Sequence, residues 1–229
     1  MTLVAFDGTW NDELPNPEKR PSNVMRFWDA YTSDKIYKRG IGNDEDYPLF
    51  AQLLCGAFGL GGKNIVEVAC MELGALLEKG KPATIDVVGF SRGGALALHF
   101  ANIAALKGVP LPSTKKTERK RIPNLSGKGH RFKVTHHFIM RPVTVRWLGL
   151  WDTVPEMGIP GNDINLGYML DLPKGAKGAH ALALDVSSRL FPLHRVNNAR
   201  EVWFMGAHSE VGGGSGNERL ADCTLRWMV

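Results

Sequence analysis

The sequence predicts an α/β fold, in which a mostly parallel sheet carries helices on both faces. Short apolar runs of strand length alternate with longer segments whose apolar residues have helical spacing, a pattern typical of parallel sheets with covered faces. A glycine-flanked serine, Gly89-Phe90-Ser91-Arg92-Gly93, stands between one such run and one such segment. Of the 229 residues, 44% are hydrophobic, enough to fill one core of this class. We therefore expect a single domain over 1–229, with loop or lid excursions at 109–141 and 155–178.

The first part of the chain alternates expected strands and helices. The apolar run 3–6 ends at a turn signal and indicates a buried first strand. Ser22 is placed to cap a helix that runs to Tyr31, and residues 35–38 indicate a second strand. Asn64 is expected to cap the next amphipathic helix, which ends at Gly80.

The middle of the chain contains the most apolar segments. Residues 84–88 indicate a third strand, and the segment after the serine motif is apolar on most sides, which predicts a buried helix to Lys107. Residues 110–129 are polar, basic and broken by prolines, so we expect an irregular excursion. The β-rich run 143–151 predicts a fourth strand.

The last part is expected to add one strand and two helices. Residues 179–190 are interpreted as a helix and residues 201–205 as a fifth strand. Ser215 and Glu218 have the spacing of a capping box for a final helix.

The motif around Ser91 has the spacing of a nucleophile turn. A sharp strand-to-helix turn holds a serine hydroxyl clear of the sheet, beside the positive end of a helix. Its crowded backbone leaves no room for side chains at Gly89 and Gly93. The flanking strand and helix make an idle serine in a glycine-rich turn the weaker interpretation.

Three polar residues follow expected strands, where the carboxyl ends of a parallel sheet gather ligands. Ser91 follows the third strand, Asp152 the fourth and His208 the fifth. The order Ser, Asp, His is that of α/β-hydrolase triads. An imidazole can take the hydroxyl proton at neutral pH, and a buried carboxylate orients it. We predict Ser91 as nucleophile, His208 as general base and acid, and Asp152 as the orienting acid.

Alternatives to these assignments are weaker. Asp185 is the second choice for the acid, because its expected helical position suits that role less well. Asp7, after the first strand, is expected to orient a loop near the site. The remaining histidines are interpreted as structural or solvated: His99, His130, His136, His137, His180 and His194.

An oxyanion on the substrate needs two backbone N–H donors. We expect one from Arg92, the residue after the nucleophile, and the other from Gly8 or Thr9 in the loop after the first strand. The competing interpretation of that loop is a simple tight turn.

Positive charge is concentrated in the middle of the chain. The net charge is +5, yet eleven Lys and Arg residues stand against one Glu between Lys107 and Arg146. Such a surface attracts the phosphates of lipids or nucleic acids, although a solvated loop explains it equally well. Few aromatic residues are interleaved, which argues against a nucleic-acid platform. The residues expected to meet lipid headgroups are Lys115, Lys116, Arg119, Lys120 and Arg121.

The cysteines and the N-terminus indicate the compartment. Cys55, Cys70 and Cys223 have neither zinc spacing nor a disulfide framework, so we expect reduced thiols, no metal site and no cofactor. No signal peptide precedes the first strand, and no apolar run is long enough to span a bilayer. We expect a protein that is cytoplasmic as synthesised, with export by a signal-independent machine left open.

Five segments that span nearly the whole chain carry a resemblance to known proteins: 6–11, 89–93, 147–154, 180–185 and 202–214. Together they resemble a family of uncharacterised α/β-hydrolase-like proteins that includes phospholipase effectors of bacterial type VI secretion. The family's serine, aspartate and histidine fall on Ser91, Asp152 and His208. The resemblance implies hydrolysis of glycerophospholipid acyl esters and delivery into a rival cell. It also implies an immunity protein or a secretion-apparatus component as partner.

The leading hypothesis is a serine ester hydrolase acting on lipids, of phospholipase A type, with an acyl-enzyme intermediate and peripheral membrane contact. One alternative is a soluble carboxylesterase for small substrates, in which the basic segment has no role. Another is a non-catalytic module that binds nucleic acid or protein through its basic surface. The complete set of serine, aspartate and histidine argues against this last reading.

Overall fold

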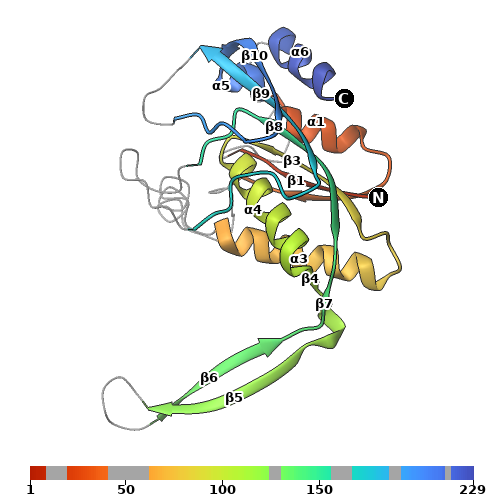
Figure 1. Cartoon of the computed structure of the whole chain (residues 1–229), viewed down its shortest axis with the longest axis vertical. Helices are drawn as coiled ribbons and strands as arrows, with labels where there is room; N and C mark the ends of the chain where they lie inside the picture. The colour runs from red at the N-terminus through yellow and green to blue at the C-terminus, as the bar shows by residue number, and fades with distance from the viewer. Residues whose placement is uncertain (9–19, 41–61, 124–129, 156–166, 186–191, 215–217) are drawn as a thin grey trace.

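A six-stranded parallel sheet forms the centre of the molecule (Figure 1), with the order β10-β9-β8-β3-β1-β2. The computed structural model describes residues 1–8, 20–40, 62–123, 130–155, 167–185, 192–214 and 218–229. Because the strands are parallel, their carboxyl ends lie at one edge of the sheet. The strands are β1 (Thr2–Phe6), β2 (Asp34–Lys38), β3 (Thr84–Phe90), β8 (Thr144–Trp151), β9 (Lys177–Asp185) and β10 (Arg200–Ala207).

Helices cover both faces of this sheet. On one face, α3 (Gly62–Glu78) and α4 (Arg92–Lys107) share a core with β1, β3 and β8. On the other face lie α1 (Asn23–Ala30), α5 (His208–Gly212) and α6 (Glu218–Met228). Figure 1 shows α3 and α4 side by side, apart from the other three helices. This arrangement confirms the predicted α/β class.

Neighbouring residues of the central strands serve different cores. In β3, Ile85 and Val87 pack under α3 and α4, whereas Val88 and Phe90 belong to the core of the opposite face. A strand buried on both faces requires continuous apolar sequence. This is why the apolar runs predicted β3 and β8 correctly.

A cap was predicted at the start of α1 and at the start of α3, and the structure has only the first of these two caps. Ser22 caps α1 as predicted, because its Oγ accepts the N–H of Met25 at 3.1 Å. Asn64 is not the cap of α3, since the helix already includes Gly62. A β-carbon on Gly62 would lie 3.0 Å from Leu96 of α4. The predicted cap at Asn64 is therefore wrong, and Gly62 packs closely against α4.

The helix predicted at 179–190 is wrong for residues 179–185. Lys177–Asp185 form β9, in parallel register between β8 and β10, and residues 186–191 lie outside the described part. Alanine and leucine favour helix in isolation. An Ala-Leu run whose two faces are both covered is also well buried as a strand, so periodicity alone cannot separate the two.

The irregular excursion expected at 110–129 contains regular structure instead. β5 and β6 form an antiparallel pair that projects from the body (Figure 1), and we call this pair the basic ribbon. Both of its faces are exposed, so its sequence lacks the apolar alternation that predicts a strand. The elements here are β4 (Val109–Pro110), η1 (Pro112–Thr114), β5 (Lys116–Pro123), β6 (His130–His137) and β7 (Met140–Arg141).

The described part of the first expected excursion does not form a lid over the sheet. Figure 1 shows the basic ribbon on the far side of α3 and α4 from α5. In the second excursion, residues 156–166 lie outside the described part, and Tyr168, Leu170 and Leu172 pack against the core of α3 and α4. The lid role of 109–141 therefore receives no support from its position.

Candidate active site

Ser91, Asp152 and His208 meet at the carboxyl edge of the sheet. Ser91 lies between β3 and α4, Asp152 follows β8, and His208 begins α5 directly after β10. Ser91 Oγ is 2.9 Å from His208 Nε2, and Asp152 Oδ2 is 2.6 Å from His208 Nδ1. Both are hydrogen-bond distances. A hydroxyl bonded to an imidazole that also faces a carboxylate is arranged for nucleophilic acyl transfer.

The turn that holds Ser91 is too tight for side chains on its glycines. A β-carbon on Gly93 would lie 2.3 Å from the backbone oxygens of Phe6 and Asp7, and one on Gly89 would lie 2.6 Å from the carbonyl oxygen of Gly93. Backbone atoms cannot move aside as a flexible side chain can. The steric reason predicted for these glycines is confirmed, and the end of β1 lies against the serine turn.

Two residues of the site have strained backbones. Ser91 has a φ of 56° and Asp152 a φ of 38°; in the described part of the chain, Asn198 is the only other non-glycine residue with a positive φ. Such conformations cost about 1–3 kcal/mol each and persist only where surrounding contacts enforce them. At Ser91, the N–H donates to the Trp151 carbonyl, and the Ser91 carbonyl accepts from Gly94 and Val154. Strain of this kind gathers at functional sites.

The imidazole of His208 is held by packing as well as by hydrogen bonds. The Phe90 ring lies against it, with 4.7 Å between ring centroids. The side chain of His208 is 31% exposed, whereas that of Asp152 is 10% exposed. A substrate can therefore approach the imidazole while the carboxylate stays shielded from water.

Asp152 is fixed by β9, the strand that lies where a helix was predicted. Its Oδ1 accepts the N–H of Ala183 at 2.8 Å, and its backbone N–H donates to the Ala181 carbonyl at 2.8 Å. One carboxylate oxygen is thus bonded to the sheet, and the other faces His208.

The two other aspartates considered for the site make different contacts. Asp185 ends β9, and its Oδ2 accepts the N–H of Gly206 at 3.0 Å. Asp7 is buried at the end of β1, where it accepts hydrogen bonds from Ser22 Oγ at 2.5 Å and Tyr37 Oη at 2.6 Å. The carboxylate that faces the imidazole is that of Asp152, and Asp7 ties β1 to α1 and β2 beside the serine turn.

The expected oxyanion donors differ in their positions. Arg92 is the first residue of α4, in the turn whose N–H groups have no acceptor within their own helix. The N–H of Gly8 donates to Asp7 Oδ1 at 2.6 Å, so it is used inside its own loop. Thr9 lies outside the described residues. Burial lowers the pKa of the Arg92 guanidinium to about 10.

The structure gives His180 contacts beside the site that the sequence did not predict. His180 falls in the segment predicted to be a helix, but the structure buries it fully in β9. Its Nε2 accepts the N–H of Thr153, the residue after Asp152, at 3.1 Å. A lone histidine in an apolar run was the available signal, and the expected helix obscured it. Among the other histidines, His99 Nδ1 accepts the N–H of Met169 at 3.2 Å, and burial lowers the pKa of His99.

The residues expected to contact headgroups lie away from this site. All are exposed, on β5 or immediately before it, and Figure 1 separates the basic ribbon from α5. The structure does not bring them to Ser91. They are Lys115, Lys116, Arg119, Lys120 and Arg121.

The described residues do not meet the requirements of a metal site, a disulfide or a membrane-spanning helix. They contain no group of three or more His, Cys, Asp and Glu side chains arranged to hold a metal ion. Cys70 and Cys223 are free thiols, and burial raises the pKa of Cys70 to about 12; Cys55 lies outside the described part. None of the described helices combines the length and apolar character needed to span a bilayer.

Known proteins share both sequence and fold with this chain. The family model "T6SS, Phospholipase effector Tle1-like, catalytic domain" matches residues 2–229. An uncharacterised protein from Pseudomonas aeruginosa matches with a TM-score of 0.62 and 21% identity, over 99% of this chain and 45% of that one. The Tle1 effector bound to the VgrG spike of the type VI secretion system matches with a TM-score of 0.60 and 21% identity, over 94% and 51%. At this identity the likeness shows the fold alone, and the chain spans about half the length of both structures. No curated protein matches significantly.

Proposed function

Because this chain belongs to the Tle1-like catalytic-domain family of type VI secretion phospholipase effectors, we propose that it hydrolyses phospholipid acyl esters through Ser91, His208 and Asp152. The activity is of phospholipase A type. The observation that carries the proposal is the pair of contacts on His208, 2.9 Å to Ser91 Oγ and 2.6 Å to Asp152 Oδ2. The family supports a lipid ester as the bond that is cleaved.

The first half of the reaction forms an acyl-enzyme. Ser91 Oγ attacks the ester carbon while His208 Nε2 takes the hydroxyl proton, and Asp152 holds the tautomer and balances the imidazolium charge. The oxyanion is stabilised by the Arg92 N–H and a second donor from the loop after β1, for which Thr9 is the remaining candidate. His208 then gives its proton to the leaving oxygen of the lysophospholipid.

The second half releases the fatty acid. Water attacks the acyl group on Ser91 as the same imidazole takes one of its protons, and that proton returns to Ser91 Oγ. No external reactant other than water is needed. The exposed side of His208 is where this water can enter.

We assign the peripheral membrane contact to the basic ribbon. Directly paired residues of an antiparallel ribbon share a face, so one face carries Phe132 opposite Arg121 and Val134 opposite Arg119. Phe132 is 67% exposed and Val134 48% exposed. Apolar side chains flanked by arginines suit the headgroup boundary of an anionic bilayer. The ribbon is distant from α5, so it would hold the enzyme on the membrane rather than bind the lipid being cleaved.

Delivery by type VI secretion is part of the same proposal. The related Tle1 effector was solved bound to a VgrG spike, and we extend such a complex to this chain, together with an immunity protein in the producing cell. Co-elution of the chain with a VgrG from the same genome tests the first point. Separate elution at micromolar concentration would remove the spike from the proposal.

Active-site labelling coupled to lipid analysis tests the catalytic proposal. We expect a fluorophosphonate probe to label Ser91 in the wild type, and phospholipid vesicles to yield lysophospholipid and fatty acid. Ser91→Ala should show neither. Ser113→Ala is the matched control, because the Ser113 hydroxyl bonds only the exposed Glu78 among its described contacts and should leave both signals intact.

Two results would redirect the assignment. Rapid turnover of short-chain esters without any lipid product would favour the soluble carboxylesterase. If the wild type is neither labelled nor active on any ester, the serine hydrolase proposal fails.

A further inference from the structure

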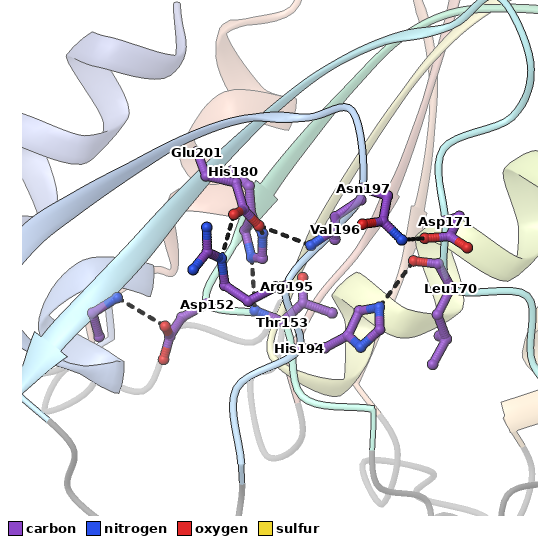
Figure 2. Close-up of polar contacts among 11 residues, drawn as sticks. Asp152, Thr153, Leu170, Asp171, His180, His194, Arg195, Val196, Asn197 and Glu201 are labelled. Atoms are coloured by element: carbon purple, nitrogen blue, oxygen red, sulfur yellow. Dashed lines mark hydrogen bonds and ion pairs between the residues drawn. The ribbon is translucent and has the colours of Figure 1, made fainter.

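Thr153, the residue after Asp152, is held at both of its backbone polar groups. Its N–H donates to His180 Nε2 at 3.1 Å (Figure 2). Its carbonyl accepts the N–H of His194 at 2.8 Å. His180 comes from β9, and His194 comes from the segment before β10. The backbone next to the acid therefore cannot shift without losing bonds to two other parts of the chain.

The contact with Thr153 determines where the proton of His180 lies. Because an N–H group points at Nε2, that nitrogen must present its lone pair, and the ring proton is on Nδ1. Nδ1 is 3.2 Å from Glu201 Oε1, so the Nδ1–H donates to this carboxylate. His180 is therefore a neutral imidazole, oriented at both nitrogens.

Glu201 is well suited to be the acceptor. Burial alone would raise the pKa of Glu201, but hydrogen bonds from His180, from the Val196 N–H and from Arg195 outweigh burial and lower it to about 2. Oε1 accepts the Val196 N–H at 2.8 Å, and Oε2 pairs with Arg195. One carboxylate thus ties His180 to the same segment that holds the Thr153 carbonyl.

We propose that His180 and Glu201 form a second histidine–carboxylate pair, which positions Asp152 for catalysis. This rests on the proposed hydrolase function of the site. Asp152 has a strained φ of 38°, and such strain persists only where neighbouring contacts enforce it. His180 is a positioning residue: its described hydrogen bonds go to Thr153 and Glu201, and it acts by fixing where the Asp152 carboxylate stands.

Protonation of His180 would break this arrangement. A proton on Nε2 would face the Thr153 N–H, so that two donors would oppose each other. Burial lowers the pKa of His180; Glu201 from β10 and Asp152 after β8 oppose that effect, and His194 adds to it. The folded protein therefore keeps His180 neutral to lower pH than an exposed histidine.

Matched variants of the full chain test the pair. His180→Phe keeps a ring but removes both nitrogens, and His180→Gln keeps an acceptor without a titratable group. His194→Gln is the control, because its imidazole bonds the Leu170 carbonyl rather than the Thr153 N–H. Circular dichroism and thermal unfolding establish that each variant is folded.

We expect kcat to be lower in His180→Phe and to be partly restored in His180→Gln. On a soluble short-chain ester, kcat of His180→Phe should fall about 100-fold with KM within about twofold, as expected when a catalytic group is misplaced by about 1 Å. His180→Gln should recover at least about tenfold of this loss, and His194→Gln should equal the wild type. If His180→Phe does not fold, Glu201→Gln replaces it, since it keeps the ring and weakens the acceptor.

A second measurement does not need turnover. The proton in the 2.6 Å hydrogen bond between His208 Nδ1 and Asp152 Oδ2 is expected far downfield of ordinary amide protons in the proton NMR spectrum. It should persist in His180→Gln and His194→Gln, and shift or broaden in His180→Phe. If it behaves so while the wild type hydrolyses no ester, the positioning role stands and the hydrolase proposal fails.

Three outcomes overturn the proposal. The first is a folded His180→Phe with unchanged kcat and an unchanged downfield resonance. The second is a loss in His180→Phe that His180→Gln does not reduce. The third is an equal loss in His194→Gln, because general packing around Thr153 would then explain the effect.

Discussion

Asp152 combines a strained backbone with a complete set of partners. Its N–H bonds to Ala181, its Oδ1 accepts from Ala183 and its Oδ2 faces His208. Substituting asparagine preserves the shape of this side chain but removes its charge. The amide also offers an NH₂ group in place of an acceptor, so the imidazole of His208 is pushed toward the wrong tautomer.

We expect Asp152→Asn to lower kcat by about 10³- to 10⁴-fold, the loss seen when a triad acid is neutralised. Steady-state hydrolysis of a soluble ester measures it. Asp185→Asn is the control, since the Asp185 carboxylate bonds Gly206 and an amide oxygen can still accept that bond. A larger loss in Asp185→Asn than in Asp152→Asn would transfer the role of the acid to Asp185.

The short helix α5 carries His208 but has only five residues. Isolated helices of this length are not stable, so α5 depends on its neighbours. Asn23 of α1 is the main polar link: its Nδ2 lies 3.0 Å from the Val211 carbonyl in α5 and 2.9 Å from the Ala221 carbonyl in α6. Through Asn23, α1 therefore holds α5 and α6 together.

Asn23→Ala is expected to destabilise the protein by about 2–3 kcal/mol, because the buried carbonyls of Val211 and Ala221 would then share the single hydroxyl hydrogen of Thr224. Urea unfolding measures the change, and ester hydrolysis should fall as α5 loosens. Asn197→Ala, at an exposed asparagine that bonds Asp171, should cost less than about 1 kcal/mol. Equal losses in the two variants would contradict this role of Asn23.

The molecule as a whole separates a compact α/β body from an exposed, positively charged ribbon. β5 and β6 pair only with each other among the described strands, so both of their outer edges are open. Lysine and arginine on such edges discourage pairing with other chains. The same charges attract anionic surfaces at long range, which is consistent with the proposed membrane contact.

Neutralising the ribbon should weaken membrane binding without altering the chemistry at Ser91. With five basic residues changed to glutamine, partition onto anionic vesicles should fall at least about tenfold, given about 1 kcal/mol per basic residue near a membrane. Turnover of a soluble ester should be unchanged. The residues to be changed are Lys115, Lys116, Arg119, Lys120 and Arg121.

The control for this experiment carries the same change in charge at exposed positions elsewhere. If it weakens vesicle binding as much as the ribbon variant, net charge rather than the ribbon is responsible. If the ribbon variant binds like the wild type, the membrane role is rejected. The control positions are Lys79, Lys107, Lys174, Arg219 and Arg226.

The stability of the whole molecule should depend on pH through His180. Folding lowers the pKa of His180 below its ordinary value, so the unfolded chain takes up that proton at higher pH than the folded protein does. Stability is therefore lost as pH falls through the ordinary histidine range. We expect Tm to fall more from about pH 7.5 to about pH 5.5, across the ordinary histidine pKa, in the wild type than in His180→Gln. Equal slopes would show that His180 is not held neutral.

Most of the fold could be predicted because local signals agreed with burial. The apolar run 84–88 suits a strand covered on both faces, and Ser22 caps α1 with its own side chain. The prediction failed where environment outweighed local preference. The Ala-Leu run of β9 has helical propensity but lies between two strands, and the basic ribbon has no buried face to leave an apolar pattern.

Local sequence predicts the serine turn, the class of sheet and the three candidate residues at strand ends. These features depend on glycine spacing and on the period of apolar residues, which short segments of sequence contain. Local sequence does not predict which carboxylate faces His208. Asp152 follows β8 and Asp185 ends β9, and only the register of β9 between β8 and β10 brings one to the imidazole and leaves the other on Gly206. The hydrogen bonds among His180, Glu201 and Thr153 join residues from three segments of the chain. These bonds exist only when β8, β9 and β10 lie side by side in the folded sheet.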